Sequence, residues 1–155
     1  MKKGIIIAVI AALVIGGFIY FVAGVSSVTP PIKKYQYLGS VNQLLSGIQG
    51  YASTNPNVTF KITDTVGSRS NGYGIYMTIG MKKNGHDITY RLMCEGDDNN
   101  SIVKTKVHLI LAFDETAKTG GYQLNGKGIK PLVDDFETDF LVGLKNKQNL
   151  QIIPL

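Results

Sequence analysis

The sequence predicts an α+β domain behind a single N-terminal transmembrane helix. Three observations lead to this fold class: an uncharged apolar run at residues 4–25, four later stretches of alternating apolar and polar residues, and an amphipathic helical pattern near the C-terminus. We expect one two-layer domain in which a helix, a four-to-five-stranded antiparallel meander and a second helix follow one another. The predicted parts are a cytoplasmic stub with the membrane helix at 1–27, a linker at 28–32 and the folded domain at 33–155.

The apolar run is long enough to cross a bilayer as a helix. At about 1.5 Å per residue, its residues 4–25 reach about 33 Å, which covers the hydrocarbon core. Lys2 and Lys3 precede the run, and positive side chains favour the cytoplasmic side, although Lys33 and Lys34 at its other end weaken the bias. We therefore expect a single-pass signal-anchor in a bacterial inner membrane, with the N-terminus inside and the domain outside the cytoplasm.

Two other interpretations of this run stay open. Lysines, an apolar stretch and then small residues are also the order of a cleaved signal peptide, although the run exceeds the roughly 7 to 15 residues of a signal core. The charged start followed by an apolar helix also resembles a type IV prepilin. Val9 stands where that family carries an acidic residue, and Pro30-Pro31 would end its long helix early.

Small residues recur every four positions along the predicted membrane helix, at Gly4, Ala8, Ala12 and Gly16. Such a stripe lets two helix backbones approach closely, and close packing drives the association of helices in lipid. Gly and Ala are also common in membrane helices that have no partner. We expect this face to pack against a helix of another membrane protein.

The domain opens with a helical pattern over residues 33–52 and continues with strands. Asn55-Pro56 ends the helix. Alternation with a period of two then predicts strands at 58–62, 73–81, 88–94 and 103–111, each with one apolar face, and a short strand at 122–125. This pattern is typical of an antiparallel sheet that is covered on one side. Between the second and third strands, Asn84-Gly85 predicts a two-residue hairpin because both positions favour positive φ.

The clearest amphipathic helix covers residues 129–144. Its apolar positions follow the helical period, and its acidic residues are expected on the solvent side, where they complement the helix dipole: Asp134, Asp135, Glu137 and Asp139. A last strand is expected at 150–153. The order of these elements is loosely similar to that of cystatin-like or NTF2-like periplasmic domains of bacterial assembly machines. No sequence motif is shared with them.

No set of residues predicts catalysis, a metal or a cofactor. Cys94 is the single cysteine and falls on the apolar face of a strand, which predicts a buried thiol. His86 is expected to be a solvated hairpin residue, and residues 97–100 a polar turn that lacks the spaced carboxylates of a calcium loop. Lys127 lies between two glycines before a helix, and a loop at the start of that helix explains this pattern better than a phosphate site. We therefore expect no enzyme.

The polar face of the predicted sheet is the best candidate for binding a partner. It carries aromatic and basic residues that alternate outward: Tyr76, Arg91, Lys104, Lys106 and His108. The domain holds 14 of the 16 Lys and Arg residues against 11 acidic residues, and a net charge of about +3 is too small to indicate nucleic-acid binding.

Together these features predict a non-enzymatic, membrane-anchored accessory subunit of a bacterial envelope protein complex. It would dock through its transmembrane helix and its extracytoplasmic domain, and its partners would be the membrane and another membrane protein or complex. The alternative is an anchored module that binds a lipid or another small apolar ligand between the curved sheet and the helix at 129–144. Added mass on the isolated domain in native mass spectrometry would indicate such a ligand.

Overall fold

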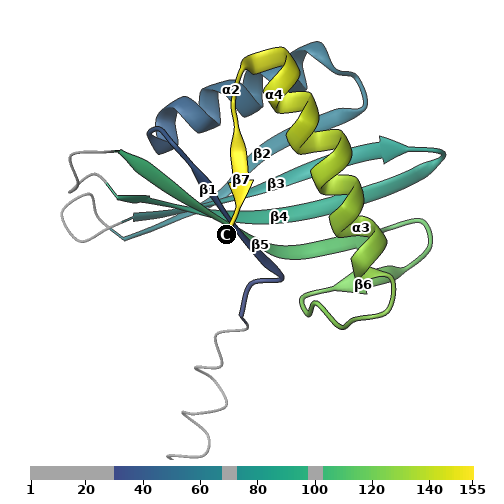
Figure 1. The fold of residues 1–155 in the computed structure, drawn as a ribbon. Coiled ribbons are helices and arrows are strands. Elements are labelled where there is room, and N and C mark those ends of the chain that lie inside the picture. Colours follow the sequence, from purple (N-terminus) through teal and green to yellow (C-terminus); the bar gives the residue numbers. More distant parts are fainter. Residues whose placement is uncertain (1–29, 68–72, 98–102) are drawn as a thin grey trace, which may run out of the picture.

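The computed structural model describes residues 30–67, 73–97 and 103–155, which form a sheet and two helical segments (Figure 1). In chain order the elements are β1 (Lys33–Tyr37), α2 (Val41–Thr54), β2 (Val58–Gly67), β3 (Tyr73–Lys83), β4 (His86–Asp97), β5 (Lys104–Asp114), β6 (Thr119–Gly121), α3 (Ile129–Asp135), η1 (Phe136–Leu141), α4 (Val142–Gln148) and β7 (Ile152–Pro154).

The strands form one seven-stranded sheet in the order β2-β3-β4-β5-β1-β7, and β6 also pairs with β5. All pairings are antiparallel. Helix α2 and the rod made of α3, η1 and α4 cross the same side of the sheet (Figure 1). The predicted α+β class with a mainly antiparallel sheet is therefore confirmed.

The start of the domain differs from the prediction because residues 33–37 form a strand and not the first turn of a helix. Tyr35 and Tyr37 are buried in the core, whereas Leu38, which the helical pattern placed on the apolar side, is 61% exposed. The helix begins at Val41, where Ser40 accepts a hydrogen bond from the backbone of Gln43 and the Gln43 side chain accepts one from the backbone of Ser40. This capping box was visible in the sequence as Ser-x-x-Gln.

The sheet has more strands than the expected four or five. Strand β1 pairs with β5 and with the C-terminal strand β7, so the two ends of the domain complete the sheet together. The short strand after β5 lies at Thr119–Gly121 and not at 122–125. The central meander of β2 to β5 follows the prediction, and its hairpin has positive φ at Asn84 (51°) and at Gly85 (81°).

The core fills the space between the sheet and the helices with aromatic rings. Phe136 and Phe140 stack with centroids 5.2 Å apart, and Phe136 also lies 5.0 Å from the ring of Tyr90 and 5.8 Å from that of Tyr35. All four side chains are fully buried. Burial of each ring stabilises the fold by about 1.5 to 3 kcal/mol, so this cluster makes a large contribution to the packing of the helical rod on the sheet.

The described residues contain no helix that is long and apolar enough to cross a membrane. The run at residues 4–25, with its stripe of Gly4, Ala8, Ala12 and Gly16, lies outside the described residues.

Candidate docking surface

The five residues predicted to face a partner lie on the side of the sheet opposite the helices, which we call the open face. Tyr76 is on β3 and Arg91 on β4, and β5 carries Lys104, Lys106 and His108. Their strands are neighbours in the sheet. The residues next to them in sequence, such as Met77 and Val107, are buried on the helix side. Alternation along a strand therefore directs all five outward together.

Strand register sets the neighbours of these residues. Tyr76 is paired with Met93, Met93 with His108, and His108 with Lys34 of β1, which gives one row across four strands. The next row places Lys106 between Glu95 and Gln36. Because directly paired side chains point to the same face, Tyr76, Met93 and His108 form a continuous half-buried strip at the centre of the open face.

A β-bulge adds two apolar side chains to this face. The pairing of β4 with β5 shifts between Arg91 and Leu92, which are opposite Leu111 and Leu109, so Ile110 is the extra residue. A bulge of one residue reverses the alternation beyond it. Leu111 and Phe113 therefore point to the open face, although the period of two in the sequence placed Leu111 on the covered side.

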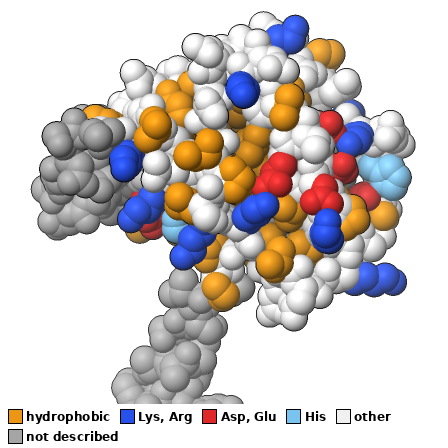
Figure 2. Space-filling model, in the orientation of Figure 1, with side chains coloured by type: hydrophobic (Ala, Val, Ile, Leu, Met, Phe, Trp, Pro, Cys, Tyr) orange, Lys and Arg blue, Asp and Glu red, His pale blue; other side chains and the backbone are white. Residues whose placement is uncertain are grey.

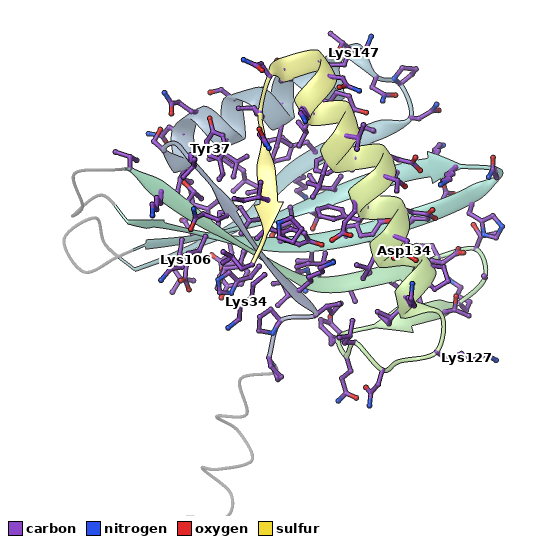
Figure 3. The ribbon with its side chains drawn as sticks, in the orientation of Figure 1. Lys34, Tyr37, Lys106, Lys127, Asp134 and Lys147 are labelled. Atoms are coloured by element: carbon purple, nitrogen blue, oxygen red, sulfur yellow. The ribbon has the colours of Figure 1, made fainter. Side chains whose placement is uncertain are left out.

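The border of the open face is mainly basic. Arg91 and Lys106 are exposed, and so are Lys34 on β1 and Lys61 on β2; Figure 3 labels Lys34 and Lys106, away from Asp134 and Lys147 on the helical rod. The acidic residues of the same face that the structure describes near this strip are Glu95, opposite Lys106, and Asp64, opposite Tyr76. The surface thus combines an apolar strip with an excess of positive charge.

The open face is hollowed beside its aromatic residue. A recess of about 360 Å³ is lined by Tyr76 and Arg91 together with Thr63, Asp64 and Val66 of β2. The pairing of β2 with β3 shifts between Ile62 and Asp64, so Thr63 is an extra residue in the edge strand. A bulge bends the edge strand at this point, and its extra residue Thr63 lines the recess.

His108 is neutral at the centre of this basic surface. Burial lowers the pKa of His108 below its ordinary value of 6.5, and the positive charges of Lys34 and Lys106 lower it further, against an opposing effect of Glu95. Desolvation and like charges both disfavour the protonated ring. At neutral pH the imidazole therefore acts as a polar, uncharged member of the strip.

The acidic residues of the helical rod do more than face solvent, which corrects the expectation from the sequence. Lys83 at the end of β3 contacts Asp135 at 2.6 Å and Asp139 at 2.5 Å. On the other side of the rod, Lys33 contacts Glu137 at 2.5 Å. These ion pairs bridge the helix to the sheet, and acidic and basic side chains lie side by side on the surface shown in Figure 2.

His86 is a further residue whose partner the sequence did not indicate. Its Nδ1 atom lies 2.7 Å from Oδ2 of Asp114, at the far end of β5, while its side chain is 46% exposed. Backbone N–H donation from Ala117, the His86 contact and N–H donation from Thr116 lower the pKa of Asp114. The pair ties the β3–β4 hairpin to the loop after β5, and a separation of 28 residues left no local signal of it.

The Cys94 side chain is fully buried, and desolvation raises its pKa to about 12. The predicted burial of this thiol agrees with its place in the structure.

The candidate ion sites of the sequence show no ligand arrangement in the described residues. Gly128 precedes α3 in the left-handed conformation (φ 80°), as expected for a helix-start loop. Residues 98–100 of the predicted polar turn lie outside the described residues. In the parts of the chain that the structure describes, no three His, Cys, Asp or Glu side chains are grouped to hold a metal.

Comparisons of the chain with protein-family models, with curated proteins and with solved structures found no match.

Proposed function

We propose that this protein is a non-enzymatic accessory subunit of a bacterial envelope complex, anchored in the inner membrane by residues 4–25. The domain, outside the cytoplasm, docks on another membrane protein through its open face. The main observation behind the proposal is that the described helices cover only one side of the sheet. The described helices pack on one side, and the other side presents apolar side chains with a basic border.

The composition of the open face supports docking to a protein. Interfaces are enriched in Tyr, Met, Phe and Arg at their centres, and a standard interface needs about 800 Å² on each partner. The strip of Tyr76, Met93 and His108, with Arg91 in the next row and Phe113 one row further along the same face, supplies these residue types on three adjacent strands. The basic border favours a partner whose facing surface has an apolar centre and acidic edges, since complementary charge guides association and fixes orientation.

The membrane helix supplies the second contact in this proposal. Gly4, Ala8, Ala12 and Gly16 would let a partner helix approach closely, so that two weak contacts on one chain reinforce each other. An anchored domain also meets its partner at a high effective concentration. The open face therefore does not need high affinity of its own.

Blue-native electrophoresis of mild-detergent extracts tests the proposal. We expect the native protein to migrate in a larger complex. Ala12→Leu adds bulk where the helix backbones meet and should release the protein from that complex, while Leu13→Ala on a neighbouring face should leave it in place. Membrane insertion is unchanged in Ala12→Leu because Leu is at least as apolar as Ala. Migration of the native protein as a free monomer would contradict the proposal.

The alternative of an apolar ligand between the sheet and the helical rod has less support. Phe136, Phe140, Tyr35 and Tyr90 fill that space with contacting rings, so a ligand there would have to displace packed side chains. Native mass spectrometry of the full chain, after the detergent has been removed in the instrument, tests this alternative. A bound lipid that survives removal of the detergent would favour the alternative.

A further inference from the structure

We propose that the loop of residues 122–127, between β6 and α3, sits in the headgroup region of the bilayer and fixes how the domain stands on the membrane. The partner is a lipid surface. This inference rests on the membrane anchor of the proposed function and adds a second membrane contact to it.

The loop exposes apolar side chains on a fixed backbone. Leu124 is 60% exposed and Tyr122 is 49% exposed, and Lys127 at the end of the same loop is exposed as well. The backbone N–H of Gly120 donates to the carbonyl of Lys127 at 3.0 Å and closes the loop at its base. Inside it, the N–H of Gly126 donates to the carbonyl of Gln123 at 2.9 Å. The loop therefore presents Tyr122 and Leu124 in a defined turn.

The loop begins beside the point where the chain runs toward the anchor. Strands β1 and β6 pair with the same strand, β5: Lys33 is opposite Leu109, and Gly121 is opposite Ala112. Three residues along a strand span about 10 Å. Both strands run antiparallel to β5, so the last residue of β6 and the first residue of β1 face each other across this short gap. In Figure 1 the N-terminal part of the described chain and the loop after β6 both lie on the lower side of the domain.

The few residues between the apolar run and the described domain limit how far the domain can lie from the membrane. The apolar run ends at residue 25, and Pro30 is the first described residue. Five residues span at most about 17 Å even when fully extended. The lower side of the domain must therefore lie within reach of the headgroups, and the exposed loop lies on that side.

The side chains of the loop suit this position. Tyr is favoured where an apolar ring and a hydroxyl meet the membrane–water boundary, and Leu enters the boundary of the acyl chains. Lys127 is directed away from the domain at this end (Figure 3) and can meet an anionic headgroup. A single exposed Leu is ordinary on a protein surface. This loop differs because it exposes two apolar residues beside the anchor.

Fluorescence quenching by lipid tests the inference directly, because the chain contains no Trp. The full chain carrying Leu124→Trp is reconstituted in vesicles of phosphatidylcholine and phosphatidylglycerol with brominated acyl chains. The matched control is Leu38→Trp, since Leu38 is equally exposed (61% against 60%) but follows the opposite end of β1. We expect a blue-shifted emission and a loss of intensity at position 124, with neither change at position 38.

Three results would overturn the inference. Unquenched emission at position 124 in protein that floats with the vesicles would do so and would leave the proposed function standing. Equal quenching at both positions would show that the loop has no special place. Failure of both variants to float with vesicles would remove the anchor, and with it both this inference and the proposed function.

Discussion

Tyr35 donates a hydrogen bond from its phenol to Oε1 of Glu137 at 3.0 Å, which joins the first strand of the domain to the middle of the helical rod. The two residues are 102 positions apart in the sequence. Burial, with contributions from the charge and the hydrogen bond of Glu137, raises the pKa of Tyr35, so the phenol stays protonated and can only donate to the carboxylate. Glu137 also contacts Lys33, so that Tyr35, Glu137 and Lys33 form a polar cluster at the edge of the aromatic core.

This hydrogen bond predicts a specific loss of stability. Tyr35→Phe keeps the ring against Phe136 but removes the donor to Glu137, and a hydrogen bond to a charged group contributes about 1.5 to 3 kcal/mol. We expect thermal unfolding in mild detergent, followed by circular dichroism, to show a lower Tm. In a double-mutant cycle with Glu137→Gln, the two changes should be less than additive. Strict additivity would show that the contact contributes nothing.

Lys83 and Lys82 give a matched test of the ion pairs on the helical rod. Lys83 contacts Asp135 and Asp139, whereas the neighbouring Lys82 is 71% exposed and lies 4.0 Å from Asp87. Lys83→Met should lower the free energy of unfolding by about 0.5 to 2 kcal/mol, because two nearby carboxylates lose their shared cation and each partly exposed pair contributes at most about 1 kcal/mol. Lys82→Met should leave it nearly unchanged. Equal effects of the two changes in urea unfolding would argue against a role for the Lys83 pairs.

Cys94 should be inert in the native protein. It is fully buried, and its pKa of about 12 keeps it as a thiol at pH values where maleimides react with exposed cysteines. We expect labelling only after denaturation. Cys94→Ser should cost about 1 to 3 kcal/mol of stability, since a hydroxyl in this place has no assured partner. Rapid labelling of the native protein would contradict the burial.

His108 should make stability depend on pH. Because its pKa is lower in the folded state than the ordinary 6.5, the unfolded state binds more protons as the pH falls below about 6.5. Stability is therefore fully present above that value and is lost as the pH falls toward the pKa of the folded protein. His108→Gln should lose less stability between about pH 7.5 and about pH 5.5 than the native chain. The same loss in both proteins, measured by thermal unfolding, would assign the effect to other groups.

The elements that the sequence predicted correctly are those determined by residues close together in the chain. Alternation placed β2 to β5, and the φ preference of Asn84-Gly85 placed the hairpin between β3 and β4. Strand β1 was missed because the helical pattern of the following residues was expected to begin at residue 33, although Tyr35 and Tyr37 alternate with a period of two and the capping box at Ser40 marks the start of the helix.

The features that were not predicted depend on residues that are far apart in the sequence or on strand register. The register shift at Ile110 turns Leu111 toward the open face, and nothing in the local pattern indicates a bulge there. The contacts of Glu137 with Lys33 and of His86 with Asp114 depend on the final topology of the sheet. The residues of the open face could be named from the sequence because a period of two directs them outward whatever their neighbours are. Their rows across β3, β4, β5 and β1 required the structure.

Site-specific photo-crosslinking in cells tests the central claim, docking through the open face, most directly. A benzophenone amino acid replaces Lys106 on the open face or, as the control, Lys147 on α4; both lysines are exposed and Figure 3 labels both. The account predicts that irradiation links position 106 to a partner protein and yields no such product at position 147. Crosslinks from position 147 with none from position 106 would contradict it, because the partner would then contact the helix side of the domain.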